Sequence, residues 1–325
     1  MIHDEVLRSE WIVACASTTV QETPVQVLIL GERVVLFRTA DGVHAFRDIC
    51  IHRGAALSLG CVQNNRLVCP YHGWEYAPDG SCVKIPQLPA GRPIPTKARA
   101  ARFHCIEAYG FVWVNLGHGE APLFSLPEYD DSAFRHVVWG PSRVSAKPPR
   151  IIENFLDVGH LSFVHEGFLG VRTHAEIGEY RVAEGEDGVL RSGEIEVYQP
   201  DPDGSGQSRY VYYIYEILGP LSVRFIKRDP LTGSRMTILL SIRPDDEQTS
   251  TAYGLISFDY ETGMTDEQIT GFQDMIFAQD KPIVENQRPE ELPLDLQQEL
   301  SLKCDGVSIA YRRYLARRRV TFGTA

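Results

Sequence analysis

The first half of the chain alternates short apolar runs with turn residues. The runs are rich in β-branched and aromatic side chains, and they cover residues 25–30, 34–38, 43–47, 74–76, 82–85 and 111–116. Dipeptides such as Gly31-Glu32 and Asp41-Gly42 separate neighbouring runs. Turn dipeptides between runs of this kind are typical of β-hairpins. The pattern therefore predicts a small antiparallel β domain in this part of the chain.

The second half mixes strand-like and helix-like patterns. Residues 150–163 have helical spacing, and a second helix begins at Thr265, which forms a capping-box pattern with Gln268. Pro282 is expected to disturb this helix, and a last helix covers about residues 307–319. Alternating apolar runs predict strands over residues 190–198, 208–218, 222–228, 236–243 and 251–260.

A proline-containing segment separates the two patterns. It extends from residue 122 to residue 149 and includes Pro141 and the string Lys147-Pro148-Pro149. Prolines between periodic segments are typical of loops and linkers. We therefore expect an α+β chain with two domains, an all-β domain over residues 1–140 and a sheet-plus-helix domain over residues 141–325.

Composition and charge narrow the class of protein. The 325 residues are 43% hydrophobic and 23% charged, as in a soluble globular protein. No apolar run approaches the roughly 18 residues of a membrane span, and the start MIHDEVLRSEW is unlike a secretory signal. The net charge of −11 argues against nucleic acid as a partner. The seven scattered cysteines indicate a reducing cytoplasm rather than a disulfide framework.

Two short motifs offer metal ligands at a specific spacing. They are Cys50-Ile51-His52 and, after sixteen intervening residues, Cys69-Pro70-Tyr71-His72. Two thiolates and two imidazoles suit a [2Fe–2S] centre in which two histidines replace two cysteines on one iron. A Cys₂His₂ zinc site is the alternative, although zinc ligand pairs usually stand two to four residues apart, and a single residue separates Cys50 from His52.

A second set of polar residues follows the proline-containing segment. Asn154, Asp157 and His160 are three residues apart and share one face of the predicted helix. His165 lies five residues beyond His160, about 140° further round an ideal helix. Both histidines can therefore bind one metal only if the helix ends or distorts between them, and Gly167 makes an ending in this region plausible.

These motifs together resemble those of the Rieske non-haem iron oxygenases, in particular the monooxygenase and demethylase branch. The resemblance rests on the strings CIHRGAALSLG and CPYHGWEY, on N-x-x-D-x-x-H-x₄-H downstream of them, and on FAQDKPIVENQ. It implies an N-terminal all-β Rieske domain and a helix-grip catalytic domain. It also implies a mononuclear Fe(II) held by His160, His165 and a carboxylate, for which we assign Asp280 and keep Asp274 and then Glu285 as alternatives.

The resemblance also implies roles for the other two polar residues of this segment. Asp157 would accept the ring N–H of His160, and the equivalent aspartate in the family also contacts a cluster histidine of a neighbouring subunit. The electron path would then run from His72 to Asp157 of the next chain and on to His160, which requires an oligomer, and the family implies a homotrimer. Asn154 would lie beside the iron or the substrate, or it is simply a polar residue near the helix start.

The function that the resemblance implies is that of the oxygenase component of a monooxygenase system. The chain has no G-x-G-x-x-G after a strand and no P-loop. Electrons from NAD(P)H would therefore arrive through a separate reductase with flavin, a ferredoxin-type cluster or both. With O₂, the protein would hydroxylate or O- or N-demethylate a small aromatic or heterocyclic substrate. The alternatives are a ring-cis-dihydroxylating dioxygenase and a Rieske electron carrier.

Overall fold

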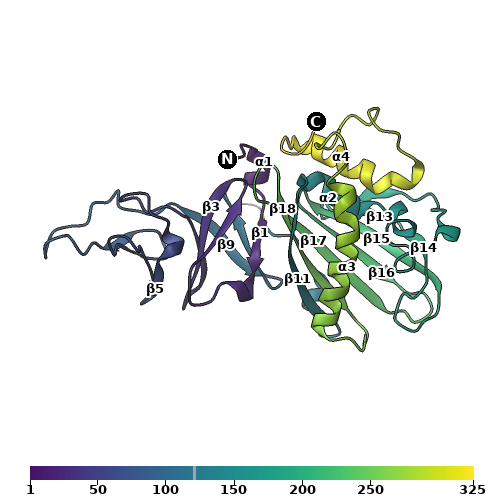
Figure 1. Ribbon diagram of the computed structural model, residues 1–325, viewed down its shortest axis with the longest axis horizontal. Helices are drawn as coiled ribbons and strands as arrows, with labels where there is room; N and C mark the ends of the chain where they lie inside the picture. Colours follow the sequence, from purple (N-terminus) through teal and green to yellow (C-terminus); the bar gives the residue numbers. More distant parts are fainter. Residues whose placement is uncertain (120–121) are drawn as a thin grey trace. The chain divides into compact units, whose positions relative to one another are not determined.

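The computed structural model describes residues 1–119 and 122–325, which divide into two compact units (Figure 1). The first unit comprises Met1–Pro122 with Pro244–Glu247, and the second comprises Leu123–Arg243 with Gln248–Ala325. No helix in these described ranges is both long and apolar enough to span a membrane.

The first unit is built from β-strands, as the hairpin pattern predicts. A six-stranded sheet has the order β1-β10-β9-β4-β3-β2, and a four-stranded sheet has the order β5-β6-β7-β8. The short helix α1 (Glu5–Arg8) precedes them. The strands are β1 (Ile12–Ala16), β2 (Val25–Ile29), β3 (Glu32–Thr39), β4 (Gly42–Arg47), β5 (Cys61–Gln63), β6 (Arg66–Val68), β7 (Glu75–Tyr76), β8 (Cys82–Lys84), β9 (Arg102–Ala108) and β10 (Phe111–Asn115).

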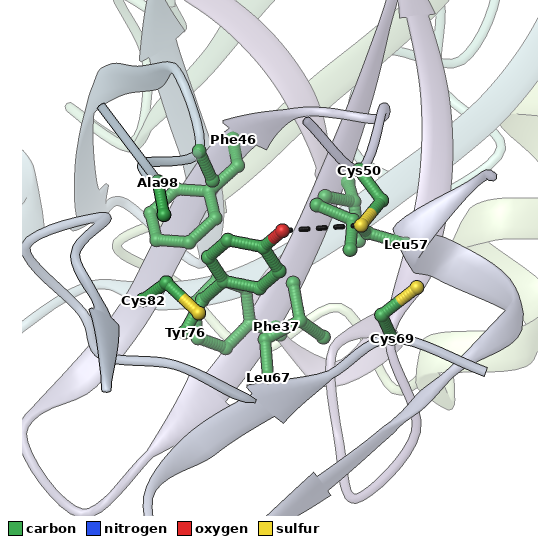
Figure 2. Close-up of a cluster of buried hydrophobic side chains, with 11 residues drawn as sticks. Phe37, Phe46, Cys50, Leu57, Leu67, Cys69, Tyr76, Cys82 and Ala98 are labelled. Carbon is green, nitrogen blue, oxygen red and sulfur yellow. Dashed lines mark hydrogen bonds between the residues drawn. The ribbon is translucent and has the colours of Figure 1, made fainter. Parts of the chain in front are cut away.

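Aromatic side chains fill the space between the β3–β4 hairpin and the β5–β8 sheet. Phe37, Phe46 and Tyr76 are buried there, and Phe37 and Phe46 meet edge to face at 4.9 Å (Figure 2). Burial of one such ring contributes about 1.5–3 kcal/mol. Cys50 and Cys69 belong to the same buried cluster, so the two cysteine loops begin from a packed core.

The second unit is an eight-stranded sheet with three helices. The sheet has the order β11-β18-β17-β16-β15-β13-β12, with β14 paired to β15, and pairs such as β15 with β16 are antiparallel. The strands are β11 (Arg135–Val144), β12 (Val182–Glu184), β13 (Leu190–Ser192), β14 (Ile195–Gln199), β15 (Arg209–Gly219), β16 (Ser222–Arg228), β17 (Arg235–Pro244) and β18 (Ser250–Phe258).

The helices of this unit are α2 (Pro148–Leu156), α3 (Asp266–Val284) and α4 (Gly306–Arg318). The predicted capping box of Thr265 and Gln268 starts α3. Helix α3 runs across the sheet (Figure 1). It is fixed to β11 through Trp139, whose indole N–H donates to Asp274 at 2.8 Å and whose ring packs on Phe277. The predicted α+β class, with an all-β first unit and a sheet-plus-helix second unit, is confirmed.

Four local expectations differ from the structure. The helix expected over residues 150–163 ends at Leu156, and Pro282 lies inside α3 without ending it before Val284. The strand expected over residues 190–198 is divided at Gly193 into β13 and β14. The expected domain boundary at residue 140 falls inside β11, because this proline-containing segment pairs with β18 instead of forming a linker.

A buried ion network joins α2 to α4. Arg312 of α4 donates to both carboxylate oxygens of Glu153 and also to Glu299, and Arg150 donates to Glu299 at 3.0 Å. The side chains of Arg150 and Arg312 are 2% and 7% exposed. Glu153 directly precedes Asn154, so this network anchors the end of α2 that leads to His160 and His165.

We predict that Arg312→Ala strongly destabilises the second unit, because it leaves the buried carboxylate of Glu153 without its main cation. Removal of one partner from a buried pair costs about 3–5 kcal/mol, which in a unit of this size lowers the melting temperature by on the order of 10 °C. Calorimetric unfolding of the purified protein measures this shift.

Arg317→Ala is the matched control on the same helix. Its pair with Glu184 is exposed, with side-chain exposures of 57% and 44%, so we expect a loss of less than about 1 kcal/mol. Equal shifts in the two variants would contradict an anchoring role for the network.

Candidate metal centres

The two loops that carry the cysteine–histidine motifs have the same backbone design. In the first loop, the amide of Cys50 donates to the carbonyl of Ala55 at 2.8 Å, and the amide of Gly54 donates back to the carbonyl of Cys50 at 2.9 Å. Gly54 has φ +72°, a conformation that glycine adopts without strain. The loop therefore turns tightly around its cysteine and presents His52 beyond it.

The second loop repeats these contacts. The amide of Cys69 donates to the carbonyl of Trp74 at 2.9 Å, and the amide of Gly73 donates to the carbonyl of Cys69 at 3.1 Å. Gly73 has φ +69°. The sequence motifs Cys-x-His-x-Gly and Cys-x-x-His-Gly thus both form a closed turn with glycine four residues after the cysteine.

The four candidate ligands of these loops lie together. The rings of His52 and His72 meet edge to face at 4.5 Å, and Cys50 and Cys69 are each 2% exposed. Nδ1 of His52 is buried and has no hydrogen-bond partner among the described residues. A buried imidazole nitrogen without a partner is costly unless it binds something, so a metal ligand role fits this atom. Two thiols and two imidazoles fit a [2Fe–2S] centre with mixed ligation.

Two aromatic residues support this group. Trp74 stacks on the ring of His52 at 4.6 Å and 8° between planes, and the hydroxyl of Tyr76 lies 3.1 Å from Sγ of Cys50 (Figure 2). Burial raises the pKa of Tyr76 above its ordinary value. The phenol therefore keeps its proton and can donate it to the sulfur. Sequence reasoning missed the role of Tyr76, because no spacing rule connects a strand residue to a sulfur 26 positions away.

The second unit brings His160, His165 and Asp280 together. One potential ligand atom from each of these residues lies within 4.8 Å of those from the other two. Nε2 of His165 is 3.2 Å from Nε2 of His160 and 3.1 Å from Oδ1 of Asp280. His165 and Asp280 are 1% and 8% exposed. Two imidazoles and one carboxylate that face one point fit the ligand set of a non-haem Fe(II) that activates O₂.

The early end of α2 makes this meeting possible. Asp157 leaves the helix with φ −80° and ψ 109°, and its Oδ1 accepts from the amide of Gly159 at 2.8 Å. An aspartate that bonds to the backbone two residues ahead favours a turn over a continued helix. His160 then lies in a single 3-10 turn, Gly159–Ser162, so the separation of 140° on an ideal helix no longer applies.

The other sequence-predicted residues lie around the triad. Oδ2 of Asp157 is 3.6 Å from Nδ1 of His160, and Nδ2 of Asn154 is 3.4 Å from Oδ1 of Asp280. Burial alone would lower the pKa of His160, but Asp157 and Asp280 outweigh it and raise that pKa. The negative surroundings therefore favour a cation between these side chains.

The two alternative carboxylates for the metal are engaged elsewhere. Asp274 accepts the indole N–H of Trp139 at 2.8 Å, and Glu285 accepts the backbone amide of Ser145 at 2.9 Å. Gln279, which sequence reasoning treated only as part of a helix, contacts the site directly: its Oε1 is 2.7 Å from Nδ1 of His165.

Comparisons with known proteins agree with this division of the chain. The family model for the Rieske [2Fe-2S] domain matches residues 10–105, and the model for the vanillate O-demethylase oxygenase C-terminal domain matches residues 144–320. The methylxanthine N1-demethylase NdmA of Pseudomonas putida is 32% identical over 96% of this chain and 89% of that protein. The chain belongs to the Rieske oxygenase family.

Two further matches extend over most of the chain. The methylxanthine N3-demethylase NdmB of Pseudomonas putida is 29% identical to this Rieske oxygenase over 90% of the chain and 82% of that protein. The solved structure of NdmA from Pseudomonas putida CBB5 with caffeine matches at 31% identity and a TM-score of 0.81, over 96% of this chain and 91% of that one.

Family membership confirms the expected cofactor types. This Rieske oxygenase uses a Rieske [2Fe–2S] cluster and a mononuclear iron, and it is an oxidoreductase that incorporates oxygen. The Rieske match favours the cluster over the zinc alternative for the first motif pair. The oxygenase match over residues 144–320 likewise favours an oxygenase over a simple electron carrier.

We predict that Tyr76→Phe lowers the reduction potential of the cluster, because a hydrogen bond to a ligand sulfur favours the reduced, more negative state. A difference of about 1 kcal/mol between the two redox states corresponds to roughly 40 mV for a one-electron couple. Redox titration followed by visible absorption measures the shift. Tyr71→Phe, which changes an exposed ring in the neighbouring loop, is the control and should leave the potential unchanged; equal shifts would exclude a specific effect of Tyr76.

Proposed function

We propose that this Rieske oxygenase removes a methyl group from a small cyclic substrate by hydroxylating it. The observation that carries the proposal is the convergence of His160, His165 and Asp280 on one point in the second unit. Support comes from the similarity to methylxanthine N-demethylases over nearly the whole chain and from the match to a vanillate O-demethylase domain. These proteins act on N-methyl and O-methyl groups of rings according to their names.

Each of the two residue sets has its own part in this proposal. Cys50, His52, Cys69 and His72 would hold the cluster, and His160, His165 and Asp280 would hold the iron. When bound, the cluster supplies single electrons and the iron supplies a place for O₂ beside the substrate. The N–H of Asn154, 3.4 Å from Oδ1 of Asp280, would restrain that carboxylate. Asp157 would orient His160 through Nδ1, as carboxylates behind a histidine ligand commonly do.

The overall reaction balances with two external electrons. A C–H bond of the methyl group gives a hydroxymethyl group, and the second oxygen atom of O₂ leaves as water. Two electrons and one proton from NAD(P)H and one proton from solvent are consumed. A hydroxymethyl group on nitrogen or oxygen then breaks down to formaldehyde and the demethylated ring. The described residues therefore need to bind the ring and hold its methyl group at the triad.

An aromatic cluster of the second unit suits a planar substrate. Phe155 of α2 and Phe225 of β16 stack at 5.4 Å, and Tyr213 and Tyr215 pack against Phe225. Phe155 and Phe225 are only partly buried, whereas both tyrosines are fully buried behind them. We propose that this face receives the ring of the substrate.

The electron supply and the assembly are also part of the proposal. A separate NAD(P)H-dependent reductase with flavin or a ferredoxin-type cluster would reduce the Rieske centre. The working unit would be a homotrimer in which Asp157 links His160 to His72 of a neighbouring subunit. A cytoplasmic location is proposed as well, supported by the seven cysteines, none of which is paired with another in a disulfide.

We predict about three irons and two acid-labile sulfides per chain for protein purified and reconstituted without oxygen, one [2Fe–2S] cluster plus one mononuclear iron. Asp280→Ala should lower this to about two irons and two sulfides, because the triad loses its carboxylate. Asp274→Asn is the matched control on the same helix and should keep all three irons. Two irons in the wild-type protein after reconstitution would contradict the metal assignment in the second unit.

We also predict formaldehyde release from methylated rings. The probes are caffeine and vanillate, supplied with NADH, O₂ and the reductase of a related system, with xanthine as the unmethylated control. We expect about one formaldehyde for each O₂ consumed with at least one methylated probe and none with xanthine. A ring diol without formaldehyde would instead support the dioxygenase alternative.

A further inference from the structure

Gln279 lies directly beside the proposed iron site and has no role in the function described so far. It precedes Asp280 in α3, and its Oε1 is 2.7 Å from Nδ1 of His165. The other ring nitrogen of His165 faces Oδ1 of Asp280 at 3.1 Å. Two consecutive residues of α3 therefore contact the two opposite nitrogens of one buried imidazole.

We propose that Gln279 is a positioning residue that selects the tautomer of His165 and thereby makes it a metal ligand. An amide oxygen can only accept a hydrogen bond, so Nδ1 of His165 must carry the ring proton. Nε2 then keeps its lone pair, which points toward His160 and Asp280. This inference rests on the proposed iron site and deepens it.

The opposite arrangement of the amide would destroy the site. If the NH₂ group of Gln279 faced Nδ1, that nitrogen would have to accept, and the proton would move to Nε2. A protonated Nε2 cannot bind a metal ion. It would also direct an N–H at Nε2 of His160, which is 3.2 Å away. His165 is 1% exposed, so water does not compete for Nδ1.

The two histidines of the triad are thus held differently. Nδ1 of His160 lies 3.6 Å from a carboxylate oxygen of Asp157, which is beyond ordinary hydrogen-bond distance. Nδ1 of His165 instead has a close and uncharged partner in Gln279. His165 is therefore the pre-oriented ligand of the pair. Because Gln279 is uncharged, the contact that orients His165 adds no negative charge beyond that of Asp280.

Three variants test this proposal in the full-length protein with its Rieske cluster intact. Gln279→Leu removes the acceptor with little change in length, and Gln279→Glu keeps an acceptor at the same place. Gln273→Leu is the control: it makes the same Gln-to-Leu change at another position of α3, where the side chain is also half-buried. In each protein the mononuclear site is emptied with a chelator without oxygen and titrated with Co(II), and the absorbance of the Rieske cluster reports intact loading of the other centre.

The expected result is a 10- to 100-fold weaker Co(II) affinity in Gln279→Leu, the usual cost of losing the partner of a histidine ligand. Gln279→Glu should bind no more weakly than the wild type, and Gln273→Leu should match it. Proton NMR of the Co(II) form adds a readout of the tautomer. The wild type should show two exchangeable, strongly shifted N–H signals, one per histidine. In Gln279→Leu the signal of His165 should move, because its Nδ1–H has lost its hydrogen bond.

Each alternative outcome has a distinct meaning. Wild-type affinity and unmoved N–H signals in Gln279→Leu would overturn the role of Gln279. If Gln279→Leu does not fold, two other results would overturn the role of Gln279. One is weaker Co(II) binding by Gln279→Glu than by the wild type, and the other is a single exchangeable signal in the wild type. If the wild type binds no Co(II) at a site that Asp280→Ala removes, the proposed iron site fails, independently of Gln279.

Discussion

The second unit depends on one constraint: side chains from two distant segments must point at one place. His160 and His165 come from one segment, and Asp280 comes from the other. Ligand atoms of His160, His165 and Asp280 lie within 4.8 Å of one another, although 115 residues separate His165 from Asp280. Buried polar atoms are costly unless each finds a partner. The ion network of Glu153 and Arg312 therefore holds α2, which leads into the segment of His160 and His165, and Trp139 holds α3, which carries Asp280.

In the first unit, two loops of the same local design position the cysteines and histidines. Each cysteine loop closes on its own backbone through a glycine four residues after the cysteine, at positive φ. The histidines then emerge from short, rigid turns, while Tyr76 and the aromatic core support the cysteines from behind. Local turns suffice here because all four proposed ligands come from two short stretches of chain. The triad of the second unit has no such local solution, and its geometry rests on packing between helices.

Much of this could be predicted from sequence, because several signals are local. Hairpin turns, the capping box at Thr265 and the spacing of both ligand sets each depend on a few neighbouring residues, and the structure contains them. The helix end at Leu156 was missed because a hydrogen bond that the Asp157 side chain accepts from the amide of Gly159 overrides an apolar pattern that continues to residue 163. The contact of Gln279 with His165 was out of reach, since helical spacing identifies a face but not the partner on it.

We propose that one chain holds a one-electron cluster and, separately, an iron with open positions for O₂. Electron paramagnetic resonance of iron-loaded, reduced protein, recorded before and after addition of nitric oxide as a stand-in for O₂, tests it most directly. We expect two signals of about one spin each per chain, one from the reduced Rieske cluster and one from a nitrosyl adduct of the mononuclear Fe(II). His165→Ala should keep the first signal and lose the second. A nitrosyl signal that persists in His165→Ala, or none in the wild type, would show that His165 does not hold an iron that binds O₂.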